Sequence, residues 1–145
     1  MKKTVVIGIS LLIVVYLVAQ TKPTQTKPTQ TGGMKASMER GKKIYTTYCL
    51  SCHQVDGSGV PRLNPPLIKT KWVLGDKKKL IKVILHGMDE PIEIDGEEYD
   101  NVMAPHGFLK DEEVADVLTY VRNSFGNKAS VITPAEVKTV RSSRL

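Results

Sequence analysis

The sequence predicts an all-α domain of three to five helices packed into one small core, with a short β-hairpin inserted between two of them. Three observations lead to this fold class. Apolar residues recur at helical spacing in several segments that begin with capping side chains. Gly and Pro interrupt residues 49–71, which predicts a loop between the first and second helices. An Asp-Gly pair lies between alternating residues over 91–99, a pattern typical of a tight hairpin.

The first predicted helix covers residues 37–48, and Ser37 is its expected N-cap. Gly41 lies near its middle, where glycine lowers helix stability. We therefore expect Gly41 to mark a place where this helix approaches another one closely.

Two further helices are expected over 76–85 and 111–125. Asp76 is the expected cap of the first of these, and Gly87 ends it. The other opens with three acidic residues, and Asp111 is its expected cap because a lysine precedes it. The apolar faces expected to be buried are Leu80, Ile81, Ile84 and Leu85 in one helix, and Val114, Val117, Leu118, Val121 and Phe125 in the other.

A last short helix is predicted by the capping box that Thr133 and Glu136 form, with Pro134 at the first helical position. The chain as a whole divides into four parts by composition. These are a signal peptide or N-terminal membrane anchor (1–20), a flexible Thr/Lys/Pro/Gln linker (21–33), a folded domain (34–131) and a C-terminal extension with the short helix (132–145).

The N-terminal segment pairs Lys2 and Lys3 with an apolar run over 5–19. Its length of about 15 residues suits a signal peptide better than a spanning helix, which needs roughly 20. The absence of a small-residue cleavage pattern near Ala19 favours an uncleaved anchor instead. Both interpretations export the rest of the chain, to the periplasm or the outer face of the cytoplasmic membrane.

The formal net charge of +6 does not indicate nucleic-acid binding. Residues 34–131 carry 14 basic and 14 acidic side chains, so the excess lies in the two ends of the chain. A neutral domain with basic ends is poor evidence for a phosphate-binding surface, and we expect no nucleic-acid partner.

The sequence Cys-Leu-Ser-Cys-His at 49–53 carries the clearest chemistry. C-x-x-C-H is the attachment pattern of c-type haem, in which both thiols bond to one porphyrin and the histidine ligates the iron. Three alternatives fit less well. A dithiol redox pair needs a βαβ context, a zinc site needs further soft ligands, and a disulfide between cysteines this close is strained.

Four downstream residues could supply the second axial ligand of such an iron: His86, Met88, Met103 and His106. Met103 is favoured because it lies in a proline-stiffened loop just before the strongest helix. His106 is the next candidate. Taken alone, Met103 is equally explained as an ordinary core methionine.

Together these residues resemble a class I c-type cytochrome, of the monohaem bacterial kind, over about residues 36–131. The matching features, in order, are Gly41, Tyr45, the 49–53 motif, the Asn64-Pro65-Pro66-Leu67 turn, Trp72, Met103 before a proline, and the helix that begins at Asp111. The resemblance implies a small cytochrome c fold around one haem. The sequence departs from the family at Lys110, where Ser or Thr is usual, and at the 91–99 hairpin, which lengthens the approach to Met103.

The resemblance also implies residue roles. Cys49 and Cys52 would hold one haem c through thioethers, with His53 and Met103 as the axial ligands of its iron. The carbonyl group of Pro65 or Pro66 would fix the ring of the proximal histidine. Trp72 would reach a haem propionate, with a core aromatic as the equal alternative.

The function implied is one-electron transfer between respiratory or dehydrogenase partners, by a monomer associated with the membrane through its N-terminus. A haem enzyme or gas sensor with a displaceable sixth ligand is the alternative. Lys77, Lys78 and Lys79 crowd one helix start, and the region 89–100 is acidic. This asymmetry could orient the domain toward a partner, or be ordinary solvated charge.

Overall fold

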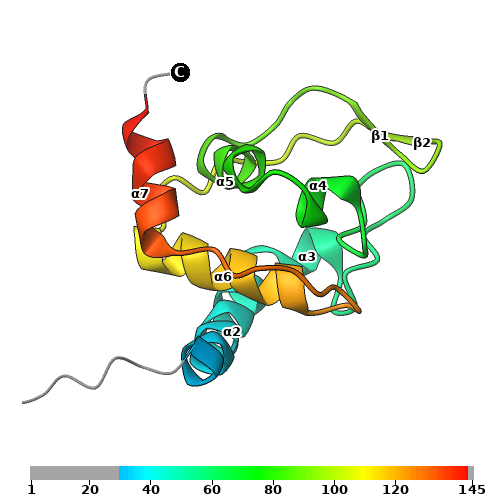
Figure 1. Ribbon diagram of the computed structural model, residues 1–145. Helices are drawn as coiled ribbons and strands as arrows, with labels where there is room; N and C mark the ends of the chain where they lie inside the picture. Colours follow the sequence, from blue (N-terminus) through cyan, green and yellow to red (C-terminus); the bar gives the residue numbers. More distant parts are fainter. Residues whose placement is uncertain (1–29, 144–145) are drawn as a thin grey trace, which may run out of the picture.

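The structure is a computed structural model that describes residues 30–143. In chain order its elements are α2 (Gln30–Tyr48), α3 (Leu50–His53), α4 (Lys71–Leu74), α5 (Lys77–His86), β1 (Ile92–Ile94), β2 (Glu97–Tyr99), α6 (Asp111–Asn123) and α7 (Pro134–Ser142) (Figure 1). The predicted all-α class with one small hairpin is confirmed. The leader or anchor predicted over 1–20, and the linker as far as residue 29, lie outside the described residues.

The predicted loop over 49–71 is wrong in part, because it contains the single-turn helix α3 and the start of a second, α4. Helices of four residues are too short to show the apolar periodicity by which a sequence indicates a helix. Thr70 caps α4, since its Oγ1 accepts a hydrogen bond from the backbone N–H of Val73 at 3.2 Å. Within residues 30–143, no helix has both the length and the apolar character needed to cross a bilayer.

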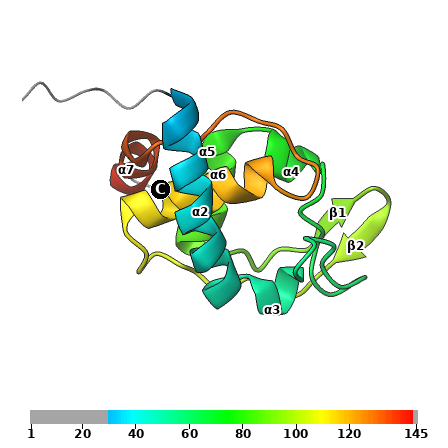
Figure 2. The ribbon, with the colours of Figure 1, turned by 90° about the horizontal axis from the view of Figure 1, so that it is seen from below.

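α2 crosses α6 in the most extensive contact between any two elements of residues 30–143 (Figures 1 and 2). Gly41 lies at this crossing, against the backbone of Asp116 and the side chain of Tyr120, so the predicted close contact is confirmed. The predicted N-cap at Ser37 is wrong, because α2 begins well before it. Ser37 Oγ instead donates to Asp116 Oδ1 at 2.6 Å, and Arg40 Nε donates to the same carboxylate at 2.6 Å.

α6 buries most of its predicted apolar stripe. Val114, Val117, Leu118 and Val121 are all buried, whereas Phe125 lies beyond the end of the helix. The expected cap at Asp111 is wrong. The carboxylate of Glu113 accepts from the backbone N–H of Lys110 at 2.8 Å, while Asp111 accepts from Arg141 Nε at 2.8 Å.

α5 and the hairpin follow the prediction closely. Asp76 caps α5, because its Oδ1 accepts two backbone N–H groups of the first turn, at 2.7 and 3.2 Å. Gly87 ends the helix with a φ of +75°, and the four apolar residues predicted to be buried are buried. In the hairpin, Asp95 and Gly96 both have positive φ, as a tight primed turn requires.

α7 packs against α5 and α6 and completes the core. Its predicted capping box is present, with Thr133 N–H donating to Glu136 at 2.7 Å and Glu136 N–H donating to Thr133 Oγ1 at 3.2 Å. Val137 and Val140 are buried. The ammonium group of Lys77 pairs with Glu136 at 2.9 Å, so this lysine is directed toward α7. Its neighbours Lys78 and Lys79 are exposed.

Candidate functional site

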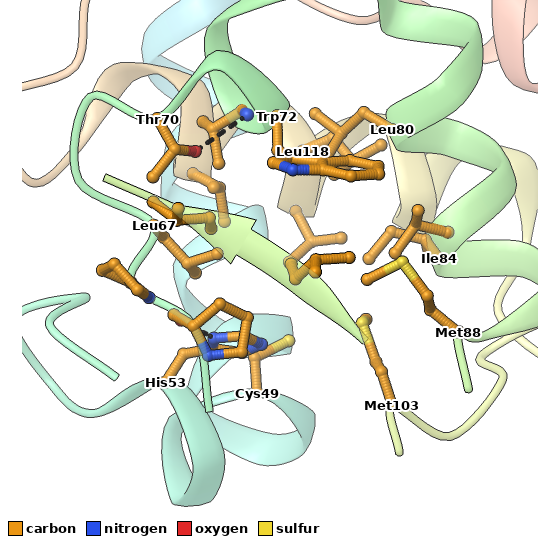
Figure 3. Close-up of a pocket in the computed structure, with 18 of the residues that line it drawn as sticks. Cys49, His53, Leu67, Thr70, Trp72, Leu80, Ile84, Met88, Met103 and Leu118 are labelled. Atoms are coloured by element: carbon orange, nitrogen blue, oxygen red, sulfur yellow. Dashed lines mark hydrogen bonds between the residues drawn. The ribbon is translucent and has the colours of Figure 1, made fainter. Parts of the chain in front are cut away.

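An apolar cleft lies between the helices, bounded by the loop after α3, α4, α5, the hairpin and α6 (Figure 3). The cleft has an inner part and an outer part that adjoin each other. Six residues line both parts: Cys49, His53, Pro65, Met88, Ile92 and Met103. The cleft therefore brings the predicted thiols, imidazole and thioether to one cavity.

Cys49 and Cys52 are free thiols at the start and middle of α3. Cys49 is half-buried on the cleft wall, and Cys52 is exposed at the rim of the outer part. Burial, with a smaller contribution from Cys52, raises the pKa of Cys49 to about 11. In the part of the chain that the structure describes, no three His, Cys, Asp or Glu side chains gather in a metal-binding cluster.

The ring of His53 has a fixed orientation. Its Nδ1 lies 3.0 Å from the carbonyl oxygen of Pro65. A carbonyl oxygen can only accept, so Nδ1 carries the proton and Nε2 keeps a free lone pair, as a metal-ligating imidazole requires. Burial lowers the pKa of His53, and nearby His106 lowers it further, against the opposing effect of the Pro65 hydrogen bond.

The backbone after α3 brings Pro65 into place. Gly59 has a φ of +68°, and a Cβ there would lie only 2.7 Å from the Pro65 carbonyl oxygen. The same turn is tied back to α3, because Gly59 N–H donates to the His53 carbonyl oxygen at 3.1 Å. The hydroxyl of Tyr45 donates to the carbonyl oxygen of Gln54 at 2.6 Å, which joins the segment after α3 to α2.

Met103 enters the cleft from a segment that packs on the end of α5. Met88 and Met103 form a two-residue antiparallel bridge, with N–H···O distances of 2.9 and 2.8 Å. A Cβ at Gly87 would meet the backbone of residues 103–105, so the glycine permits this approach. Figure 3 shows His53 and Met103 on opposite sides of the cleft, both directed into it. Met88, one of the four candidate ligands named from the sequence, lines the cleft beside Met103, a pairing that the sequence did not predict.

The predicted residues Pro66 and Trp72 line the inner part of the cleft. Trp72 is half-buried on α4 at the end of the cavity remote from His53 (Figure 3). Buried Arg122 holds α4 in place, because its guanidinium donates to the carbonyl oxygens of Val73 at 2.6 Å and of Ser130 at 3.0 Å.

The other two histidine candidates lie differently. His86 is exposed at the end of α5 and lines neither part of the cleft. His106 lines the outer part only, where its ring packs against Tyr48 and Phe108. Its buried Nδ1 has no hydrogen-bond partner within the described residues.

These groups define a class of protein. Two free thiols three positions apart, an imidazole with a fixed tautomer and two thioethers line one cleft, and this donor set fits a covalently attached c-type haem. The comparison with known proteins agrees. The cytochrome c family model matches residues 38–125, and the chain belongs to the cytochrome c family.

Three relatives illustrate the family. A cytochrome c-552 of Thermus thermophilus is 37% identical over 133 residues, covering 86% of this chain and 89% of the relative. The cytochrome c subunit of a quinone alcohol dehydrogenase from Gluconacetobacter polyoxogenes is 34% identical over 70% of this chain. That of a gluconate 2-dehydrogenase from Pantoea cypripedii is 33% identical over 71%. The match covers only 22% and 24% of these two subunits.

The predicted haem c cofactor and the predicted function as an electron carrier are confirmed. The protein is a monohaem class I cytochrome c that carries haem c and its iron, and it acts as an electron carrier. It is an electron-transfer protein, and its partners are redox proteins.

Proposed function

We propose that Cys49 and Cys52 hold the haem through thioethers, and that His53 and Met103 fill the two axial positions of its iron. The observation that carries this proposal is the placement of His53 and Met103 on opposite walls of one apolar cleft, with both thiols beside the histidine. When bound, haem c supplies one-electron Fe(III)/Fe(II) chemistry, at a potential that His/Met ligation raises.

The side chains around the cleft support such transfer in distinct ways. The Pro65 carbonyl oxygen fixes the tautomer and orientation of His53. The apolar walls exclude water, and Pro66 and Trp72 are among the residues that line the inner part. With His53 and Met103 both holding the iron, small molecules would have no open site on it, and the change of charge would require little rearrangement of the protein.

We further propose that the domain works outside the cytoplasm as a monomer, in the periplasm or anchored to the outer face of the membrane. This rests on the basic and apolar pattern of residues 1–20 and on the polar linker after it. Dehydrogenases or respiratory complexes are the proposed donors and acceptors. This is supported by the relatives that are cytochrome subunits of alcohol and gluconate dehydrogenases.

Covalent attachment is tested on a denaturing gel stained for haem. The protein is produced in a host that attaches c-type haem. We expect the wild-type band to stain, because thioether bonds survive denaturation, and Cys49→Ala/Cys52→Ala to lose the stain. Equal staining of both would contradict attachment at these cysteines.

Axial ligation by methionine is tested with the double variant Met103→Ala/Met88→Leu. It removes both thioethers from the cleft. We expect its reduced form to bind carbon monoxide, whereas the wild type does not. A double variant that stays closed to carbon monoxide would show that another residue is the sixth ligand.

A further inference from the structure

Two methionines face the cleft, and the proposed function uses only one of them. We propose that Met88 is a second thioether ligand, which takes the sixth position on the iron when the side chain of Met103 is lost. This inference rests on the proposed function, since it assumes that Met103 is the primary ligand.

The backbone pairing places the two side chains on the same side. Met88 and Met103 exchange both hydrogen bonds of an isolated antiparallel bridge, with Met88 N–H donating at 2.9 Å and Met103 N–H at 2.8 Å. Residues directly opposed in an antiparallel pair project to the same face, with Cβ atoms roughly 5 Å apart. Accordingly, both methionines line the inner and the outer parts of the cleft, with His53.

Met88 has the reach and the freedom that a replacement ligand needs. A methionine side chain has three rotatable bonds and adapts to irregular space. Both methionines are half-buried, so neither is locked inside a fully packed core. Removing the Met103 side chain frees volume directly beside Met88.

The bridge itself survives the loss of the Met103 side chain, because its two hydrogen bonds join backbone atoms. Gly87 also packs on the backbone of residues 103–105, and this contact does not depend on the thioether. Met88 therefore stays at the cleft when Met103 is shortened.

His106 is the competing replacement. It lines the outer part of the cleft only, and its backbone N–H is held by the carbonyl oxygen of Ile84 at 2.8 Å. Its ring packs against Tyr48 and Phe108. Ligation by His106 would break these contacts, whereas Met88 already lies in the inner part where Met103 lies.

The test compares four holoprotein variants: Met103→Ala, Met88→Leu, Met103→Ala/Met88→Leu and Met103→Ala/His106→Gln. The readouts are the long-wavelength charge-transfer band of ferric thioether ligation and the upfield methyl resonance of an iron-bound methionine in the reduced protein. Carbon monoxide binding reports whether the iron is open.

We expect Met103→Ala to keep one upfield methyl resonance and the thioether band, because Met88 replaces the lost ligand. Met103→Ala/Met88→Leu loses both signals and binds carbon monoxide. Met88→Leu alone keeps both signals, and Met103→Ala/His106→Gln behaves like Met103→Ala.

Two results would overturn the inference. One is a Met103→Ala protein as open to carbon monoxide as the double variant Met103→Ala/Met88→Leu. The other is a closed iron without the thioether signals, which becomes open only on adding His106→Gln. If Met88→Leu alone lost the signals while Met103→Ala kept them, the primary assignment to Met103 would fail instead. If Met103→Ala does not give folded holoprotein, Met103→Val replaces it in the same measurements.

Discussion

The crossing of α2 and α6 makes a quantitative prediction for Gly41→Ala. An added Cβ would lie 2.6 Å from the carbonyl carbon of Asp116 and 2.8 Å from the Cβ of Tyr120. Real Cβ contacts essentially never fall under 3.0 Å, so the two helices must separate. The neighbouring atoms are backbone and a Cβ, which no rotamer change can move aside.

The expected loss of stability follows from two opposing contributions. Overpacking of a tight contact costs typically about 1–3 kcal/mol, and the upper end applies here because the opposing atoms are rigid. Separation of the helices also loosens Tyr45, which is 1% exposed and packs against Tyr120 and Phe125. Alanine regains about 1 kcal/mol of helix propensity over glycine. The net expectation is a loss of about 2 kcal/mol, or roughly 10 °C in Tm.

The assay is thermal and denaturant unfolding of the holoprotein, followed by circular dichroism and by the haem absorption. Gly33→Ala is the matched control, because it lies in the same helix and a Cβ there meets no atom within 4 Å. We expect this control to be neutral or slightly stabilising. A Gly41→Ala protein as stable as the control would show that the crossing of α2 and α6 accommodates the added Cβ without cost.

Three further predictions concern the helices α4, α5 and α7. Gly87→Ala adds a Cβ at a positive φ against the Met103 segment, so we expect lower stability by about 1–3 kcal/mol and a weaker thioether band in the ferric spectrum. Arg122→Met leaves the carbonyl oxygens of Val73 in α4 and of Ser130 without this donor, and we expect a loss of about 2–3 kcal/mol by denaturant unfolding. Burial raises the pKa of Glu136, but hydrogen bonds from Lys77 and Thr133 outweigh it, and the folded pKa is lowered. Its contribution to stability is therefore present above its unfolded pKa and lost as pH falls through the folded pKa. The deficit of Glu136→Gln should be largest at neutral pH and vanish in acid.

An unchanged thioether band and Tm in Gly87→Ala would show that the α5 end does not hold the Met103 segment. An unchanged denaturation midpoint in Arg122→Met would show that α4 does not depend on the guanidinium. A deficit in Glu136→Gln that is the same at neutral and acid pH would rule out the ion pair with Lys77 as its cause.

Local patterns in the sequence predicted much of this fold. The caps at Asp76 and Thr133 and the Asp95-Gly96 turn each depend on residues within a few positions, and each was found as predicted. The close helix contact at Gly41 was predicted because a glycine in mid-helix needs a packing reason.

Two of the errors, at the predicted caps Ser37 and Asp111, arose where a distant residue competes for a local hydrogen bond. Ser37 is a good cap by local criteria, but its hydroxyl bonds to Asp116 on another helix. Asp111 likewise bonds to Arg141 of α7, and Glu113 satisfies the helix start instead. No sequence pattern reports such pairings, because they form only after the helices pack.

The candidate site likewise combines features that the sequence predicts with features that only the fold reveals. The 49–53 motif and the loop around Met103 could be identified as chemically significant because both stand out locally. The choice of Pro65 over Pro66 as the partner of His53 is decided by the turn at Gly59. The place of Met88 beside Met103 depends on a bridge between two separate segments, which the sequence alone does not reveal.

Ligation of the iron by His53 and Met103 is tested most simply by the absorption spectrum of the reduced wild-type protein, recorded before and after carbon monoxide is added. With His53 and Met103 on the iron, we expect an unchanged low-spin c-type spectrum, because the iron has no free position for carbon monoxide and serves electron transfer alone. A prompt shift on adding carbon monoxide would contradict it, because the iron would then be open to small molecules, as in a haem enzyme or gas sensor.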